Sequence, residues 1–127
     1  RAHLAYAVAE GVGFGLLDGL NTIPPMQPPL QSLSLVGGGS RSDGWAQLLA
    51  DTFGLALTRH QDAETGGAMG AARLAWLATG APVDTVCTTP PVLRRFEPDA
   101  ARHAWLRRRH ARFVAVYTAM NGAMNPQ

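Results

Sequence analysis

The sequence predicts an α/β fold. Segments with helical periodicity alternate with short segments that have the pattern of strands, in the order helix, strand, helix, strand, helix. A run of three glycines, Gly37–Gly39, joins one of these strands to the helix that follows it. The chain of 127 residues is long enough to bury about two thirds of its unfolded surface, so it can form a core.

A first helix is predicted from Ala2 to Leu20 because apolar residues recur at every fourth position. These residues are Leu4, Val8, Val12, Leu16 and Leu20. Inside this helix, Gly11, Gly13 and Gly15 each cost about 0.5 to 1 kcal/mol relative to alanine, so they predict a surface that another backbone approaches closely. The proline-rich segment 21–31 is predicted to be an irregular connection, since proline does not continue a helix.

A buried parallel strand is predicted from Ser32 to Val36, where the sequence alternates and then becomes fully apolar. The glycines follow, and either Ser40 or Ser42 can cap the next helix, with Ser40 and Asp43 at the spacing of a capping box. One face of that helix is apolar, and Gly54 is expected to be its C-cap. The face consists of Trp45, Leu48, Leu49, Thr52 and Phe53.

The second half of the chain predicts one more strand and two more helices. The strand covers 55–59, and the next helix begins near Glu64 and ends at Thr79, before a glycine. Small residues on this helix, namely Gly66, Gly67, Gly70 and Ala71, are interpreted as a face that packs closely on the sheet or on another helix. Segment 81–95 is predicted to be irregular because of its prolines, and the last helix is expected over 98–120, with Leu106, His110, Phe113 and Tyr117 on one face.

Composition excludes several classes of protein. The formal charge of +2 is too small for a nucleic-acid role, and Arg107–Arg109 point in different directions on a helix, as solvated residues do. The single cysteine, Cys87, forms no internal disulfide and fits a reducing cytoplasm. No signal peptide and no membrane span are expected, and the four histidines have no metal-ligand spacing.

The glycine turn is the main candidate for a binding site. Glycines allow positive φ and let a ligand approach the bare backbone, while the start of the next helix offers free amide hydrogens. A Walker phosphate loop is excluded because the chain has no lysine, and a dinucleotide fingerprint is excluded because Ser42 stands where it needs a glycine. The triplet alone is more typical of a tight turn without a ligand, since glycine turns are common.

Four segments together resemble the FGGY family of carbohydrate kinases, over nearly the whole chain and in the family's order. Gly37–Ser42, with the tryptophan, glutamine and Leu-Ala-Asp that follow, resembles the adenosine-binding segment of that family. Ala9–Phe14 and Glu64–Ala72 are similar to two of its glycine-containing helices, and Phe96–Pro98 to the start of its last helix. The chain departs from the pattern at Asp43-Gly44 and at Ala56, where prolines are common.

The resemblance implies the C-terminal part of the second lobe of an actin-like ATPase (ribonuclease H-like) fold, with an incomplete sheet and flanking helices. It further implies that residues 1–127 lack an N-terminal lobe and contribute the adenosine side of a cleft. Gly37, Gly38, Gly39 and Ser42 are then the expected nucleotide-binding residues, with Gly38 and Gly39 against the adenine or ribose. Asp51 is expected to be structural, and no catalytic or metal-binding residue is assigned.

The function expected from the resemblance is ATP- and Mg²⁺-dependent phosphorylation of D-xylulose to D-xylulose 5-phosphate by the complete enzyme, the fragment alone being inactive. The proton acceptor and phosphate loops that such a reaction needs are expected outside this chain. One alternative is a kinase of another sugar or polyol, and another is a non-catalytic nucleotide-binding or association module. ATP and a small sugar are the expected partners, without nucleic acid or membrane. A homo-oligomer, or association with the missing N-terminal part, is also expected.

Overall fold

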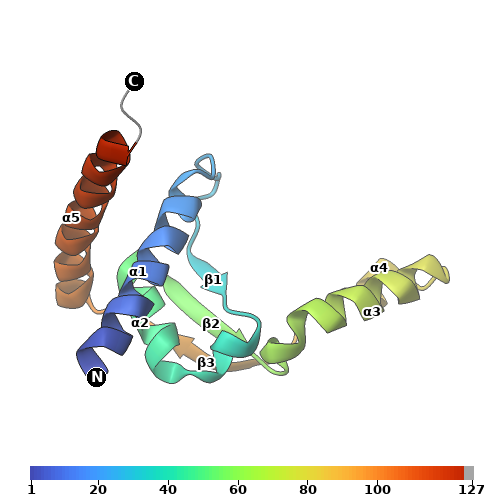
Figure 1. The fold of residues 1–127 in the computed structure, drawn as a ribbon. Coiled ribbons are helices and arrows are strands. Elements are labelled where there is room, and N and C mark those ends of the chain that lie inside the picture. The colour runs from blue at the N-terminus through green and yellow to red at the C-terminus, as the bar shows by residue number, and fades with distance from the viewer. Residues whose placement is uncertain (125–127) are drawn as a thin grey trace.

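The computed structural model of the protein describes residues 1–124 and has the α/β architecture that the sequence predicts (Figure 1). Helices and strands follow one another along the chain, with short 3-10 segments after the first two strands. The elements are α1 (Ala2–Asn21), β1 (Ser32–Ser34), the 3-10 segment Gly38–Arg41, α2 (Asp43–Phe53), β2 (Ala56–His60), the 3-10 segment Ala63–Thr65, α3 (Gly66–Ala78), α4 (Val83–Val86), β3 (Val92–Phe96) and α5 (Ala100–Met124).

The three strands form one sheet in the order β1-β2-β3. β1 and β2 are parallel, with Leu33 opposite Leu57, and β3 is antiparallel to β2, with Phe96 opposite Leu57. The prediction that 81–95 is irregular was wrong, since this segment contains α4 and most of β3. β3 was not predicted because its first four residues are exposed and only Phe96 is buried. Backbone pairing with β2, not an apolar pattern, holds the strand in place.

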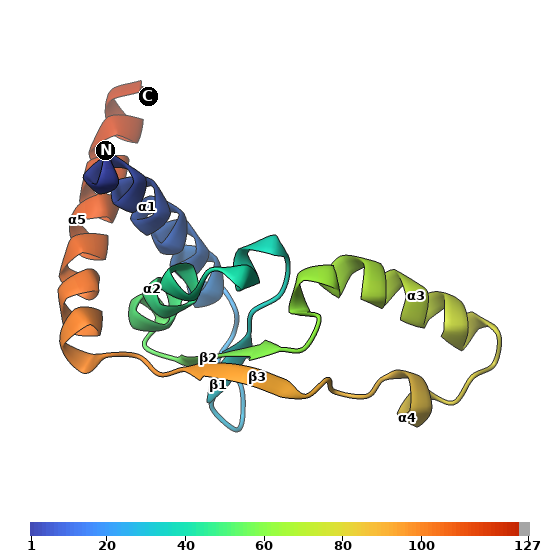
Figure 2. The same ribbon diagram turned by 90° about the horizontal axis from the view of Figure 1, so that it is seen from below.

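α2 lies against one face of the sheet, and α1 and α5 pack against α2 (Figure 2). Between α2 and the strands is a cluster of buried apolar residues: Ala46, Leu49, Ala50, Leu57 and Phe96. A second cluster of Phe14, Leu48 and Leu106 joins the three helices. Trp45 packs against both clusters, which makes the first turn of α2 the centre of the core.

α1 and α5 are also joined by an ion pair that the sequence of either helix alone does not indicate. The Glu10 carboxylate is buried and accepts hydrogen bonds from Nε and Nη2 of Arg109, each at 2.6 Å. The hydrogen bond with Glu10 raises the pKa of the Arg109 guanidinium, which also lies over the ring of Trp105. Of the three consecutive arginines expected to be solvated, Arg109 therefore has a structural role, whereas Arg107 and Arg108 are exposed.

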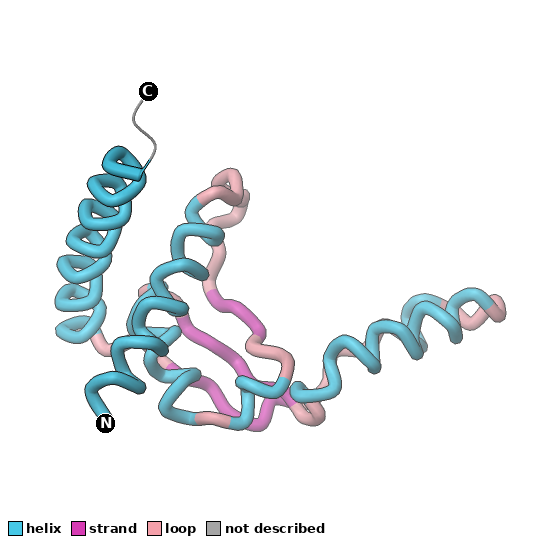
Figure 3. The backbone as a smooth tube through the Cα atoms, in the orientation of Figure 1, coloured by secondary structure: helices cyan, strands magenta, loops and turns pink. Residues whose placement is uncertain are grey.

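α3 and α4 extend together away from the rest of the molecule as an arm (Figures 1 and 3). No residue of α3 is buried. A Cβ atom added at Gly66 would lie 3.1 Å from Val36, but one added at Gly67 or Gly70 would meet nothing within 4 Å. The close packing predicted for this small face is thus not formed within residues 1–124, and only its first residue touches the body.

Other differences from the predictions are smaller. β1 is shorter than 32–36 and only half-buried, because it lies at the edge of the sheet. Of the four glycines in α1, only Gly13 faces a neighbour, with Thr52 and Leu49 of α2 within 3.7 Å of its added Cβ. Within the described residues, no helix is both long and apolar enough to cross a membrane.

Candidate functional site

The turn after β1 begins at Gly37, which has φ 89° and ψ 177°. Such a positive φ favours glycine, as the sequence predicts for this turn. The Gly37 amide donates to Ala63 O at 2.8 Å, and its carbonyl accepts from the Ser40 amide at 3.0 Å. The segment after β1 therefore has one residue of positive φ, Gly37, and a single 3-10 turn leads from it into α2.

Gly38 and Gly39 do not have positive φ, so Gly37 alone of the triplet uses this freedom. A Cβ added at Gly38 would meet nothing within 4 Å, which leaves its backbone open to a ligand. A Cβ added at Gly39 would lie 3.2 Å from Nε1 of Trp45. A side chain at Gly39 would therefore press on the indole, whereas Gly38 presents bare backbone.

Ser42 caps α2, since its Oγ accepts from the Trp45 amide at 3.2 Å and its backbone is extended. Its hydroxyl hydrogen stays available to donate outward. Ser42 also lines a cavity of about 500 Å³ between α1 and α2, together with Tyr6 and Gly44. Ser40, the other candidate cap, is fully buried, and its Oγ has no hydrogen-bond partner in the described part of the chain.

The loops that follow β1 and β2 meet at the same edge of the sheet, because the two strands are parallel. Besides the Gly37–Ala63 hydrogen bond, Arg41 Nη2 lies 3.3 Å from Glu64 Oε1. A cavity of about 570 Å³ opens beside these loops, between the strand ends and α3, with Val36 on its wall. Carboxyl ends of parallel strands are where α/β proteins commonly bind ligands.

Electrostatics at these loops favour the ionised carboxylate. The pKa of Glu64 is lowered, first by a hydrogen bond from its own backbone amide and then by the guanidinium of Arg41. A carboxyl whose pKa falls on folding stabilises the folded state above its ordinary pKa, and that contribution is lost as pH falls through the lowered value. The ion pair between Arg41 and Glu64, which links the two loops, is therefore fully formed at neutral pH.

Three charged residues connect the turn to the sheet. None of them was predicted to belong to the site. Arg59 of β2 and Arg94 of β3 stand opposite each other and both pair with Asp43, the first residue of α2. Arg59 also donates to the carbonyl of Ser40 in the turn. Asp43 was noted for its capping-box spacing and as a departure from the family pattern, and its pairing with Arg94 depends on β3, which was not predicted.

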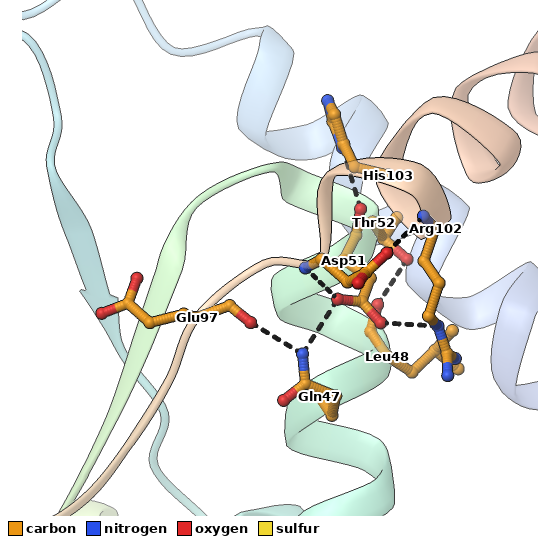
Figure 4. A network of polar contacts seen from close by, with 8 residues as sticks. Gln47, Leu48, Asp51, Thr52, Glu97, Arg102 and His103 are labelled. Atoms are coloured by element: carbon orange, nitrogen blue, oxygen red, sulfur yellow. Dashed lines mark hydrogen bonds and ion pairs between the residues drawn. The ribbon is translucent and has the colours of Figure 1, made fainter.

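At the other end of α2, Asp51 is fully buried and organises the junction of β3 with α5 (Figure 4). Its Oδ1 accepts from Gln47 Nε2 and from the Asp99 amide, both at 2.9 Å. Arg102 Nε lies 2.9 Å from Oδ2 as an ion pair, without the direction of a hydrogen bond. His103 Nδ1 donates to the Asp51 carbonyl at 2.8 Å. These contacts agree with the structural role expected of Asp51.

The described residues contain no group of three or more His, Cys, Asp or Glu side chains placed to hold a metal ion. Gly38 faces open space next to the amino end of α2.

Comparisons with known proteins found similar sequences and structures. Residues 1–79 match the model of the FGGY family of carbohydrate kinases, C-terminal domain. The chain is 39% identical over 116 residues to xylulose kinase of Escherichia coli (strain K12), covering 90% of this chain and 24% of that protein. It is 32% identical over 127 residues to L-xylulose/3-keto-L-gulonate kinase of the same organism, covering 96% of this chain and 25% of that protein.

Among solved structures, a xyloylose kinase from Brucella ovis superimposes with a TM-score of 0.77 at 35% identity, covering 96% of this chain and 25% of that one. The chain thus spans about a quarter of the length of the relatives it matches. The predicted actin-like ATPase fold, with a small sheet and flanking helices, is confirmed by this likeness.

Proposed function

The chain belongs to the FGGY family of carbohydrate kinases, and from that membership we propose that the whole protein carrying it transfers a phosphoryl group from ATP to a sugar. D-Xylulose is the proposed substrate and D-xylulose 5-phosphate the product. The identity to a xylulose kinase over most of this chain supports that choice. A relative that acts on L-xylulose or 3-keto-L-gulonate supports the alternative of another sugar.

Residues 1–127 are proposed to form the C-terminal portion of the second, nucleotide-binding lobe. The free edge of β1 supports this proposal, and so does an apolar groove of about 300 Å³ that is lined by residues of α1, α2, β1 and β2. Its walls include Leu16, Leu33 and Phe53. A strand from the rest of the lobe would cover these side chains and pair with the unpaired backbone of β1.

Gly37, Gly38, Gly39 and Ser42 are proposed as the nucleotide-binding residues. The observation that carries this proposal is the open space over Gly38, beside the capped amino end of α2. In this arrangement the backbone of Gly38 would contact the adenosine, Ser42 would donate a hydrogen bond, and Gly37 and Gly39 would shape the turn. ATP supplies the transferred phosphoryl group, with Mg²⁺ held by its phosphates and by residues elsewhere.

No residue of this chain is proposed to accept the proton of the sugar hydroxyl. Such a reaction needs a carboxylate and phosphate-binding loops, which the family resemblance assigns to other parts of the protein. We therefore expect the 127-residue chain alone to be inactive. Release of ADP in the presence of D-xylulose, above a control without protein, would contradict this expectation.

Substitution of Gly38 by valine tests the nucleotide site in the whole protein. The new side chain would enter open space and leave the fold intact, but it would collide with a nucleotide lying on the turn. We expect the affinity for ATP to fall about tenfold to a hundredfold, with the affinity for D-xylulose unchanged. Gly122→Val, at an open position on α5, is the matched control. Equal ATP affinity in both variants would show that the turn is only structural.

A further inference from the structure

The start of α2 is held to the sheet by a cluster of three charged side chains, Asp43, Arg59 and Arg94. Arg59 Nη1 lies 2.8 Å from Oδ1 of Asp43, and Arg94 pairs with Oδ2 of the same carboxylate. Both guanidinium groups also lie over the ring of Phe96, at 5.6 and 5.1 Å from its centroid. Arg59 and Arg94 reach one carboxylate because they are opposite each other in the register of β2 and β3.

Arg59 contacts the glycine turn itself. The same Nη1 that pairs with Asp43 donates to the carbonyl oxygen of Ser40 at 2.9 Å. The side chain of Arg59 is only 20% exposed, so these contacts are less screened than those of a surface ion pair. At its other end the turn is held by the hydrogen bond between Gly37 and Ala63. The backbone between these two attachments contains Gly38 and Gly39.

A glycine-rich turn has more conformations to lose than any other segment of equal length. If the turn were unrestrained, a nucleotide would have to order it on binding, and its affinity would be reduced accordingly. The two attachments remove that freedom before the ligand arrives. The contact from Arg59 restrains the part of the turn that leads into Ser42 and α2.

We propose that Arg59 is a positioning residue for the nucleotide, acting with Asp43 and supported by Arg94. It holds the turn in the conformation in which Gly38 presents its backbone and Ser42 its hydroxyl. This inference rests on the proposed nucleotide site and adds to it the residues that order the site. The sheet thereby contributes to ATP affinity through side chains that the nucleotide does not touch.

The test compares Arg59→Gln and Arg94→Gln with Arg95→Gln in the whole protein. Arg95 is the matched control because it is the next residue of β3, points to the opposite face, and pairs with Glu97 instead of Asp43. Two quantities are measured: the Kd for ATP by calorimetry, with D-xylulose as the comparison ligand, and the hydrogen exchange of the amides in 38–42 without ligand.

We expect Arg59→Gln to raise the Kd for ATP about threefold to tenfold and to speed exchange in the turn, without changing the affinity for D-xylulose. Arg94→Gln is expected to have a smaller effect in the same direction, because Arg94 does not contact the turn backbone. Arg95→Gln is expected to change neither quantity. If Arg59→Gln fails to fold, Asp43→Asn removes the ion pair but leaves the hydrogen bond from Arg59 to Ser40, so a smaller change in the same direction is expected.

A rescue variant separates positioning from general stability. Asp43 is the first residue of α2, a position that suits proline, and the extended backbone of Ser42 is compatible with a following proline. Asp43→Pro should stiffen the turn without any ion pair. In combination with Arg59→Gln, it is expected to return the Kd for ATP to within about twofold of the unsubstituted value.

The outcomes are distinguishable. Unchanged ATP affinity and unchanged exchange in Arg59→Gln would overturn the positioning role while leaving the nucleotide site intact. Equal loss of ATP and D-xylulose affinity would also overturn it, since that result indicates general destabilisation. If the unsubstituted protein binds no ATP, the proposed nucleotide site is wrong and the positioning of a nucleotide falls with it, even if exchange in the turn still depends on Arg59.

Discussion

Replacing Asp51 by alanine is expected to loosen α5 from α2 before the rest of the fold opens. The carboxylate is fully buried and lies where the chain passes from β3 into α5. It accepts hydrogen bonds from Gln47 of α2 and from the amide of Asp99, one residue before α5. It also pairs with Arg102 in the first turn of that helix. Alanine removes all three contacts at once, and those with Asp99 and Arg102 join α2 to the start of α5.

The size of the effect depends on which contacts Gln47, Asp99 and Arg102 keep or regain in the variant. A hydrogen bond to an ionised oxygen contributes about 1.5 to 3 kcal/mol. Gln47 keeps its second bond, to the carbonyl of Glu97 at 2.8 Å, so its loss is partial. The side chain of Arg102 is 54% exposed and regains water, so its pair adds less than about 1 kcal/mol. Together these losses predict a fall of about 2 to 4 kcal/mol in the free energy that holds α5 in place.

Hydrogen exchange of the α5 amides in the whole protein measures this free energy locally, and urea unfolding measures it globally. Asp51→Asn keeps an acceptor for Gln47 and Asp99, so it is expected to cost about 1 kcal/mol. Asp84→Asn, at an exposed aspartate in α4, is the control and should stay within about 0.5 kcal/mol. If Asp51→Ala changed α5 exchange no more than this control, the network of Figure 4 would not be what fixes the helix.

Three further substitutions test other parts of the structure. Gly39→Val should weaken ATP binding about tenfold relative to D-xylulose binding, because the new side chain would displace the Trp45 indole and shift the turn; titration of the folded variant with both ligands checks this. Ser40→Ala should raise the free energy of unfolding by about 1 kcal/mol, since it removes a buried hydroxyl without a partner among the described residues; a loss in urea unfolding would mean that the hydroxyl is satisfied. Gly54→Ala should cost about 2 kcal/mol or more, because φ is 66° and the His103 ring lies 2.6 Å from the new Cβ; an unchanged thermal midpoint would contradict it.

Much of the fold could be predicted from the sequence where the residues of an element themselves show its periodicity or its cap. α1, α2 and β2 fall within a residue or so of the predicted bounds, because each carries an apolar face or a clear cap such as Gly54. α3 begins two residues later than expected, after a 3-10 turn, and α5 begins at Ala100 instead of Pro98. β3 was missed because an exposed edge strand held by backbone pairing leaves little apolar pattern.

The candidate site was predictable in part for a similar reason. Positive φ at Gly37 and the cap at Ser42 are local properties, which the residue types indicate. The reason for Gly39 is not local, since it depends on where the Trp45 indole packs. The contacts of Asp43 with Arg59 and Arg94 depend on the pairing of two strands, one of which was not foreseen. Long-range pairing is the part of the site that local patterns do not contain.

The ion pair between Glu10 and Arg109 has a consequence for synthesis on the ribosome. The two residues are 99 positions apart, yet Glu10 is buried in the finished structure. A ribosome adding about 5 to 20 residues per second needs roughly 5 to 20 seconds to cover that distance. During this interval α1 has no partner for its carboxylate, and Phe14 lacks the α5 side of its cluster. The nascent chain therefore completes this helical layer only after α5 has left the exit tunnel, and until then its apolar surface is available to chaperones.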